Sequence, residues 1–296
     1  MTSTNVGRPA RWLVWHPHQK LWNWRLESAL RRAGGPLGRA FVRVLVFVDS
    51  VLLLAGVVTR RAHDLGLLHA LRAVPASRRP VLYVDCGVHK LGEQLRWMRT
   101  WFGDRCDLQI VGFEASEEHY LDAGKNLADV EQLDLRHLAL VGPDADVTSV
   151  KLYKGARSGK ADSLYAHGRS TFEVVPAARL SDLLSTEYAS ALGAAPVLLR
   201  MNIEGSEYDV VDDLVRSGVS QQIDGYFGMW DDVAKLDAER DAAFRRMLDD
   251  AGITHVTFND RDLRHPMRRF AVRLAVDHAI RRGFADKHDR QPARST

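Results

Sequence analysis

The sequence predicts an α/β protein built on a doubly wound parallel sheet. Short apolar runs that end in a polar residue are typical of buried parallel strands, and they recur through residues 79–262. Segments with helical periodicity separate these runs. This alternation of strand and helix predicts a doubly wound sheet, in which ligands bind at the carboxyl ends of the strands near the topological switch point.

Each element follows from its own pattern. Core strands are expected at 81–85, 108–114, 137–141, 197–203 and 223–229, with two further strands at 254–258 and 270–276. Helices are expected at 91–101, 117–127, 180–185, 206–216 and 232–251. Residues 150–153 and 172–175 are expected to form a hairpin around a loop rich in Gly and Ser. This loop, Ser158–Ser170, is either a substrate lid or a solvated hairpin loop.

Length and composition limit the class of protein. A chain of 296 residues is one large domain or one domain with an extension. With 46% apolar and 27% charged residues, wholesale disorder is excluded. The two cysteines, Cys86 and Cys106, cannot make a disulfide framework, so a reducing, cytoplasmic setting fits best. Zinc sites of the Cys₄ and Cys₂His₂ types are excluded by spacing.

The first 78 residues are expected to be a basic, Trp-rich helical extension. Residues 1–80 hold 13 Lys and Arg residues but only 3 Asp and Glu residues. The apolar run Val44–Val58 has 15 residues, fewer than the roughly 20 that span a bilayer, and Asp49 interrupts it. Two interpretations stay open: a peripheral membrane contact, or helices that cover the main domain. The main domain is expected at 79–285, followed by a polar tail at 286–296.

Two acids stand at the ends of neighbouring predicted strands. Asp85 is followed by Gly87, which lets the backbone approach a ligand closely, and then by a helix start. The pattern is not GxGxxG, so a dinucleotide pyrophosphate is not the natural ligand. Glu114 ends the next strand, where an acid can accept both hydroxyls of a ribose. Together the two acids indicate an adenosine-containing ligand, although each alone also suits a turn or a helix cap.

A third polar group follows the strand expected at 197–203. Asn202, Glu204 and Glu207 cluster where this strand turns into a helix. Glu207 is accounted for by a helix start, where acids favour the positive end of the helix dipole. Glu204, which precedes a glycine, is not accounted for in this way and is a candidate functional residue.

Three blocks of sequence together resemble the FkbM family of S-adenosylmethionine-dependent methyltransferases. They read Val84-Asp-Cys-Gly-Val-His-Lys-Leu-Gly92, Gly112-Phe-Glu-Ala-Ser116 and Leu199-Arg-Met-Asn-Ile-Glu-Gly-Ser-Glu207. The preceding segment Val175–Leu184 is similar to the family's Leu-Asp-Asp-Leu-Leu helix start. The resemblance covers about residues 80–230.

The resemblance implies a class I methyltransferase (Rossmann-like) fold, with a seven-stranded, mostly parallel sheet and helices on both faces. It implies O-methylation of a hydroxyl on a sugar, glycolipid or natural-product acceptor. Because no recognised nucleic-acid motif accompanies the basic C-terminal segment, no nucleic-acid partner is expected. The cofactor would be S-adenosyl-L-methionine, and the residues implied to bind it are Asp85, Gly87, Val88, Gly92, Glu114 and Ala115.

The departures from the family bear on catalysis. Asn202 replaces the family Asp, Arg200 replaces the family Lys, and His89 stands near the family Asn. Removal of the acceptor proton needs a base, for which Glu204 is the first candidate and His89 or His167 the second. Asn202 can hold the acceptor but cannot act as a base, and no metal site is assigned.

Two other functions remain open. One is a catalytically altered methyltransferase-like protein that binds cofactor or a partner without turnover, as the exchange at Asn202 would allow. The other is a different nucleoside-binding α/β enzyme such as a dehydrogenase, against which the missing GxGxxG counts.

Overall fold

The central sheet confirms the α/β, parallel-sheet prediction. The computed structural model describes residues 35–64, 79–155, 162–166, 168–230 and 233–290. Six strands lie in the order β3-β2-β1-β7-β8-β9, and every neighbouring pair is parallel. Their bounds are β1 Pro80–Cys86, β2 Asp107–Glu114, β3 Leu133–His137, β7 Val197–Met201, β8 Gly225–Gly228 and β9 His255–Val256. The strand order reverses between β1 and β7, which is the switch point of the sheet.

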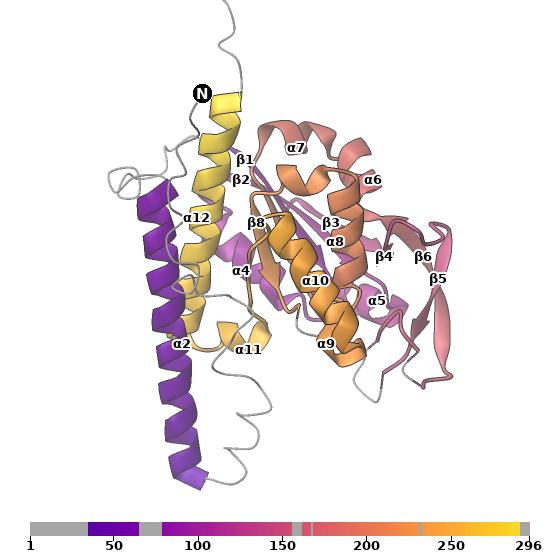
Figure 1. Ribbon diagram of the computed structural model, residues 1–296, viewed down its shortest axis with the longest axis horizontal. Helices are drawn as coiled ribbons and strands as arrows, with labels where there is room; N and C mark the ends of the chain where they lie inside the picture. The colour runs from indigo at the N-terminus through magenta and orange to yellow at the C-terminus, as the bar shows by residue number, and fades with distance from the viewer. Residues whose placement is uncertain (1–34, 65–78, 156–161, 167, 231–232, 291–296) are drawn as a thin grey trace, which may run out of the picture.

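Helices cover both faces of this sheet (Figure 1). On one face lie α4 Glu93–Phe102, α5 Glu117–Asn126 and α12 Pro266–Arg290, and on the other α6 Leu180–Thr186, α7 Ala189–Ala194, α8 Glu207–Arg216 and α10 Ala238–Asp250. Short helices α9 Val233–Leu236 and α11 Asp260–Leu263 follow β8 and β9. Strand β1 shows how alternation serves both cores: Val81 and Tyr83 face one, and Leu82 and Val84 face the other.

The predicted seventh strand is wrong. Residues 270–276 lie inside α12, and the central sheet of the described chain has six strands rather than seven. The apolar residues of this segment continue as a helical row that is buried against the sheet: Ala271, Val272, Ala275, Val276, Ala279 and Ile280. A short apolar segment fits both periods, and the continuation of the row decides for the helix.

Helix α12 also runs past the predicted start of the tail. It continues to Arg290, so residues 286–290 are helical rather than a polar tail, and 291–296 lie outside the described residues. Lys287 ties this part of the helix to the rest of the domain. Its buried ammonium donates to the Leu192 carbonyl oxygen at 2.9 Å and lies 3.2 Å from the Asp224 carboxylate.

The segment 137–141, predicted as one strand, is divided between two sheets. Its first residue ends β3, whereas Ala139–Val141 forms β4 of a second sheet. This sheet has the order β4-β6-β5, with β5 Ser149–Tyr153 and β6 Phe172–Arg179. Strands β5 and β6 pair antiparallel, which confirms the predicted hairpin. The second sheet extends from the edge of the central one (Figure 1).

The described part of the N-terminal extension is one helix, α2 Gly35–Asp64, which packs along α12 (Figure 1). Its buried side chains include Val42, Val46 and Leu53. The Trp-rich segment before it lies outside the described residues. No helix in the described ranges is long and apolar enough to cross a membrane.

Candidate functional site

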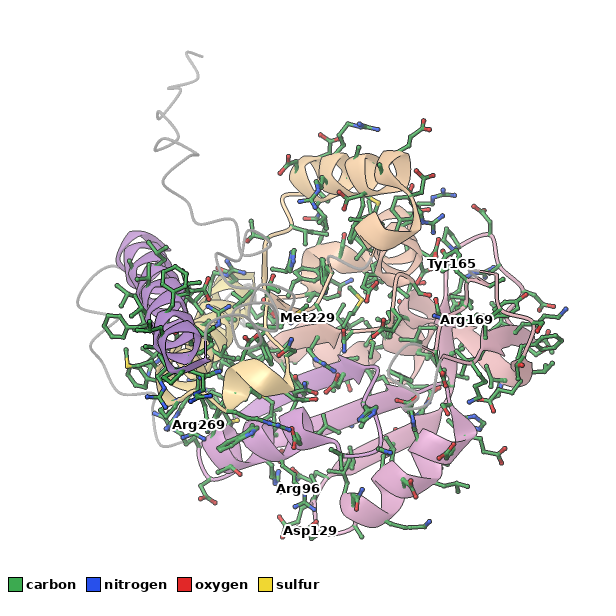
Figure 2. The ribbon with its side chains drawn as sticks, turned by 90° about the horizontal axis from the view of Figure 1, so that it is seen from below. Arg96, Asp129, Tyr165, Arg169, Met229 and Arg269 are labelled. Atoms are coloured by element: carbon green, nitrogen blue, oxygen red, sulfur yellow. The ribbon has the colours of Figure 1, made fainter. Side chains whose placement is uncertain are left out.

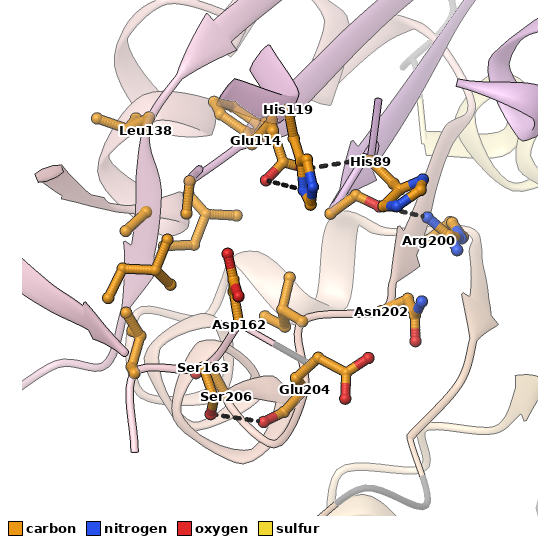
Figure 3. A pocket seen from close by; sticks show the side chains of 18 of the residues that line it. His89, Glu114, His119, Leu138, Asp162, Ser163, Arg200, Asn202, Glu204 and Ser206 are labelled. Atoms are coloured by element: carbon orange, nitrogen blue, oxygen red, sulfur yellow. Dashed lines mark hydrogen bonds and ion pairs between the residues drawn. The ribbon is translucent and has the colours of Figure 1, made fainter. Parts of the chain in front are cut away.

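A cavity of about 200 Å³ opens at the carboxyl ends of β1, β2 and β7, at the switch point of the sheet (Figure 3). Its walls come from the loops that follow these strands, from the junction of β3 and β4, and from residues 162–164. This is the place where doubly wound sheets bind their ligands. The polar side chains in its lining are His89, Gln94, Glu114, His119, Asp162, Ser163, Arg200, Asn202, Glu204, Ser206 and Asp260.

The loop after β1 is shaped by close contact with the loop after β7. Gly87 has a φ of +88°, and a Cβ at this position would collide with the carbonyl oxygen of Asn202. The Asn202 N–H donates to the Cys86 carbonyl oxygen at 2.9 Å, which fixes the two loops together. Glycine is therefore required here by loop packing, in a left-handed conformation that other residues seldom adopt. Gly87 also lines the cavity.

Glu114, at the end of β2, presents a fixed carboxylate to the cavity. Its Oε2 accepts the His89 N–H at 2.7 Å and its Oε1 accepts the Ser116 N–H at 3.0 Å. Burial raises the pKa of the Glu114 carboxyl, against the lowering effect of these two N–H groups and of His119, whose Nδ1 lies 4.0 Å from Oε1. A carboxylate has about four lone-pair positions, so Glu114 can still accept hydroxyl groups from a ligand.

Asp85 is the partner of Arg200. The two residues are neighbours in register on β1 and β7, and Arg200 Nη1 donates to Asp85 Oδ1 at 2.6 Å and to the Gly87 carbonyl oxygen at 3.0 Å. Both side chains are buried, and burial raises the pKa of Asp85 to about 6 although Arg200 lowers it. Arg200 lines the cavity whereas Asp85 does not. The structure thus places Asp85 behind Arg200.

The loop after β7 holds two of the predicted catalytic residues at the cavity, Asn202 and Glu204. Glu204 has a φ of +53°, and its carbonyl oxygen accepts the Ser163 hydroxyl at 2.9 Å. Glu207 closes the loop instead of facing a ligand, since its carboxylate accepts the N–H groups of Ile203 at 2.7 Å and Gly205 at 2.8 Å.

Backbone strain is concentrated at this cavity. Three non-glycine residues in the described ranges have positive φ: His89, Gln132 and Glu204. Two of them, His89 and Glu204, line the cavity from opposite loops. Left-handed backbone is unfavourable for such residues and clusters at functional sites, where the surrounding structure holds it in place.

The walls of the cavity are apolar on one side and acidic elsewhere. The apolar wall is formed by Phe113, Ala115, Leu138, Ala139, Leu140, Leu152 and Leu164. Besides the imidazoles of His89 and His119, the ionisable groups in the lining are the carboxyls of Glu114, Asp162, Glu204 and Asp260 and the guanidinium of Arg200. Besides Glu114, whose partners are given above, Asp162 lies 3.2 Å from Lys154 Nζ, and Asp260 accepts from Gln94. The acidic excess favours a ligand with positive charge.

Part of the loop Ser158–Ser170, expected to be either a substrate lid or a solvated hairpin loop, belongs to this wall. Asp162, Ser163 and Leu164 line the cavity, whereas 156–161 and His167 lie outside the described residues. Tyr165 fastens the end of this segment to the helices beside it (Figure 2), because its hydroxyl donates to Asp209 and the Arg240 guanidinium lies 5.0 Å from its ring.

The structure brings together six of the nine residues predicted for the site. Those that line the cavity are Gly87, His89, Glu114, Ala115, Asn202 and Glu204. The other three are not in its lining. Asp85 pairs with Arg200, Val88 is buried in the core beside α4, and Gly92 has a φ of +54° at the start of α4.

Sequence reasoning missed several lining residues, of which Asp260 and His119 are the most informative. Asp260 begins the helix after β9, so it repeats the pattern of an acid after a strand that singled out Asp85 and Glu114. His119 lies five residues after Glu114 on α5, and its ring is 4.8 Å from that of His89. No feature of the sequence alone brings these two histidines together.

No protein-family model matches the chain, and a search of curated proteins finds no match. The resemblance to the FkbM family therefore rests on the three motif blocks, and the case for a function rests on the cavity and its chemistry.

Proposed function

We propose that this chain is an S-adenosylmethionine-dependent O-methyltransferase that acts on a hydroxyl of a sugar, glycolipid or natural-product acceptor. The observation that carries the proposal is the Glu114 carboxylate, held by two backbone N–H groups at the wall of a cavity beside the switch point. An acid at this place in a doubly wound sheet accepts the hydroxyls of a ribose. The three FkbM-like blocks support the choice of cofactor.

The residues present fit this cofactor. The apolar wall around Leu138 and Leu140 suits an adenine ring, and Glu114 suits the ribose. The acidic excess suits a sulfonium and an ammonium group.

The same charges oppose a nicotinamide dinucleotide. A pyrophosphate would face Glu114, Asp162, Glu204 and Asp260 with only one guanidinium to balance it. The loop after β1 also lacks the GxGxxG pattern that cradles a pyrophosphate. Both observations favour a methyl donor over a hydride carrier.

The bound cofactor would supply an electrophilic methyl group. The chain itself must hold the acceptor hydroxyl and take its proton. We assign the proton to the Glu204 carboxylate, whose backbone is fixed by Ser163, with His89 as the second candidate. The Asn202 amide can form hydrogen bonds with the substrate hydroxyl and so orient it. Such orientation of the reacting groups lowers the barrier to methyl transfer.

A second function is favoured by two observations. Asp85 is buried, paired with Arg200 and absent from the cavity lining, and Asn202 cannot serve as a base. Both fit a methyltransferase-like protein that binds the cofactor without turnover. Passage of radiolabel from the donor methyl group into glycan or lipid extracts discriminates the two: the enzyme transfers label and its Glu204→Gln variant does not, while a binding protein transfers none in either form.

The first test is calorimetric titration with S-adenosylmethionine and S-adenosylhomocysteine. We expect the full chain to bind both, and Glu114→Ala to bind each roughly 100-fold more weakly, because hydrogen bonds to a charged group are lost. Glu118→Ala is the matched control, since this exposed acid lies on the adjacent helix α5. Absence of binding by the folded full chain would overturn the proposal. Equal binding by Glu114→Ala would remove the observation on which it stands.

A further inference from the structure

Helix α2 has two opposite faces of different character. One face is buried at Val42, Val46 and Leu53, and the helix packs along α12. The other presents large apolar side chains to solvent at helical spacing: Leu37, Phe41, Val44, Phe47, Val48, Val51 and Leu52. Leu37 is 83% exposed and Phe47 is 53% exposed, so these side chains lie on the surface and not at the edge of a buried core. We refer to these seven residues as the outer face of α2.

Asp49 does not belong to this outer face. It lies on the packed face with its carboxylate 3.0 Å from Arg268 Nη1, and both side chains are 1% exposed. The acid that interrupts the apolar run in the sequence therefore points into the protein. A carboxylate within the apolar run opposes burial of the whole helix in lipid. It does not oppose a helix that lies on the membrane surface with only its outer face in lipid, because Asp49 lies on the other face.

The outer face lies at the outside of the molecule. Figures 1 and 2 both show α12 between α2 and the sheet, and α2 extends past α11 at its lower end in Figure 1. Soluble monomers rarely expose contiguous apolar patches of this kind unless the patch binds something.

We infer that the outer face of α2 docks on the surface of an anionic lipid membrane. Residues 37–52 extend for about 24 Å at 1.5 Å per residue, which suits a helix lying along the interface. Arg39 and Arg43 are exposed on the same helix, and residues 1–80 carry 13 basic against 3 acidic residues. An apolar helix face in a basic segment of the chain is the pattern of an interfacial helix on anionic lipid. This inference does not depend on the proposed function.

The test is flotation of the full chain with vesicles of phosphatidylglycerol and phosphatidylcholine in equal parts, and with vesicles of phosphatidylcholine alone. We expect the chain to float with the first and much less with the second. The variant Phe41→Ser/Phe47→Ser/Val51→Ser should lower the partition coefficient at least about tenfold, because three apolar side chains no longer enter the lipid. All three residues are exposed, so the fold should be preserved.

The matched control is Leu121→Ser/Val174→Ser, which removes two exposed apolar side chains from α5 and β6. It should float as the unaltered chain does. Arg39→Glu/Arg43→Glu should reduce flotation with the anionic vesicles by about tenfold. The inference is overturned if the full chain floats with neither vesicle, if the triple variant floats unchanged, or if both lipids bind equally. It is also overturned if sedimentation equilibrium shows a dimer that the triple variant abolishes, because the outer face would then bind a second copy.

Discussion

Two buried Asp–Arg pairs hold different parts of this molecule. Asp85 and Arg200 join β1 and β7 in the centre of the sheet, whereas Asp49 and Arg268 join α2 and α12 at the outside. The nitrogen–oxygen distances are 2.6 Å and 3.0 Å, and no side chain of the four is more than 1% exposed. In both pairs the arginine also donates to a backbone carbonyl, that of Gly87 at 3.0 Å and that of Thr257 at 2.6 Å.

The difference lies in the backbone that carries each pair. Asp85 and Arg200 are neighbours in register on hydrogen-bonded strands, so neither can reach water unless the sheet breaks. Asp49 is carried by a helix whose main packing partner is α12, so it can reach water if α2 undocks. Both pairs join a buried aspartate to a buried arginine, although only Arg200 donates a hydrogen bond to its aspartate with good geometry. The cost of breaking each pair should depend on whether the surrounding structure can open locally.

The largest effect is expected at the central pair. Arg200→Met leaves the Asp85 carboxyl buried without its cation, and we expect a loss of about 3–5 kcal/mol in the free energy of unfolding. Urea unfolding followed by circular dichroism measures it. The double variant Asp85→Leu/Arg200→Met should regain most of the loss, because the uncompensated group is gone. A loss below about 1 kcal/mol in the single variant would show that the sheet can open locally at this pair.

The second effect is a pH dependence carried by Asp85. Its pKa is about 6 in the folded protein against an ordinary value of 3.8, because burial outweighs Arg200. Between these values the folded state keeps a proton that the unfolded state has released. The stability from Asp85 is therefore complete below pH 4 and is lost as pH rises to about 6, by roughly 3 kcal/mol.

Urea unfolding at several pH values from 4 to 7 checks this dependence. Asp85→Asn lacks the titrating group, so the difference in unfolding free energy between the unaltered chain and the variant isolates it. Glu114, Asp213 and Asp224 also have raised pKa values, and they contribute equally to both proteins. A difference that stays constant with pH would contradict the prediction.

A smaller and more local effect is expected at the outer pair. Arg268→Met leaves the buried Asp49 carboxylate without its cation. Because α2 can undock and expose Asp49 to water, we expect the free energy of unfolding to fall by only about 1–3 kcal/mol. Hydrogen exchange should show faster exchange in α2, while β1 and β7 keep their protection. Equal loss of protection in α2 and in the sheet would mean that the two regions unfold as one unit, and the contrast between the pairs would disappear.

The smallest effect is expected when both outer partners are replaced. Asp49→Leu/Arg268→Met puts apolar groups into a buried site, and we expect a change within about 1 kcal/mol of the unaltered chain. Calorimetric titration with S-adenosylhomocysteine should give the same affinity as the unaltered chain, since neither Asp49 nor Arg268 lines the cavity. Weakened affinity would show that α2 influences the cavity.

Sequence patterns predicted a strand correctly where a short apolar run ends at a polar or turn-forming residue. The strands predicted at 81–85, 108–114 and 197–203 correspond to β1, β2 and β7, and the acid at the end of β2 lies at the cavity as expected. The strand predicted at 270–276 was wrong, because the apolar residues of this segment form part of the buried face of helix α12. Local alternation could not reveal that this face goes on to Ile280.

The sequence by itself determined the alternation of strands and helices and the polar residues at the strand ends, because both depend on short-range periodicity and turn chemistry. Only the tertiary structure decided which of these residues meet. It paired Asp85 with Arg200 across adjacent strands, brought His119 to His89, and turned Asp49 away from the outer face of α2. Such contacts depend on register and on packing between distant segments, and burial then fixes which charges must have partners.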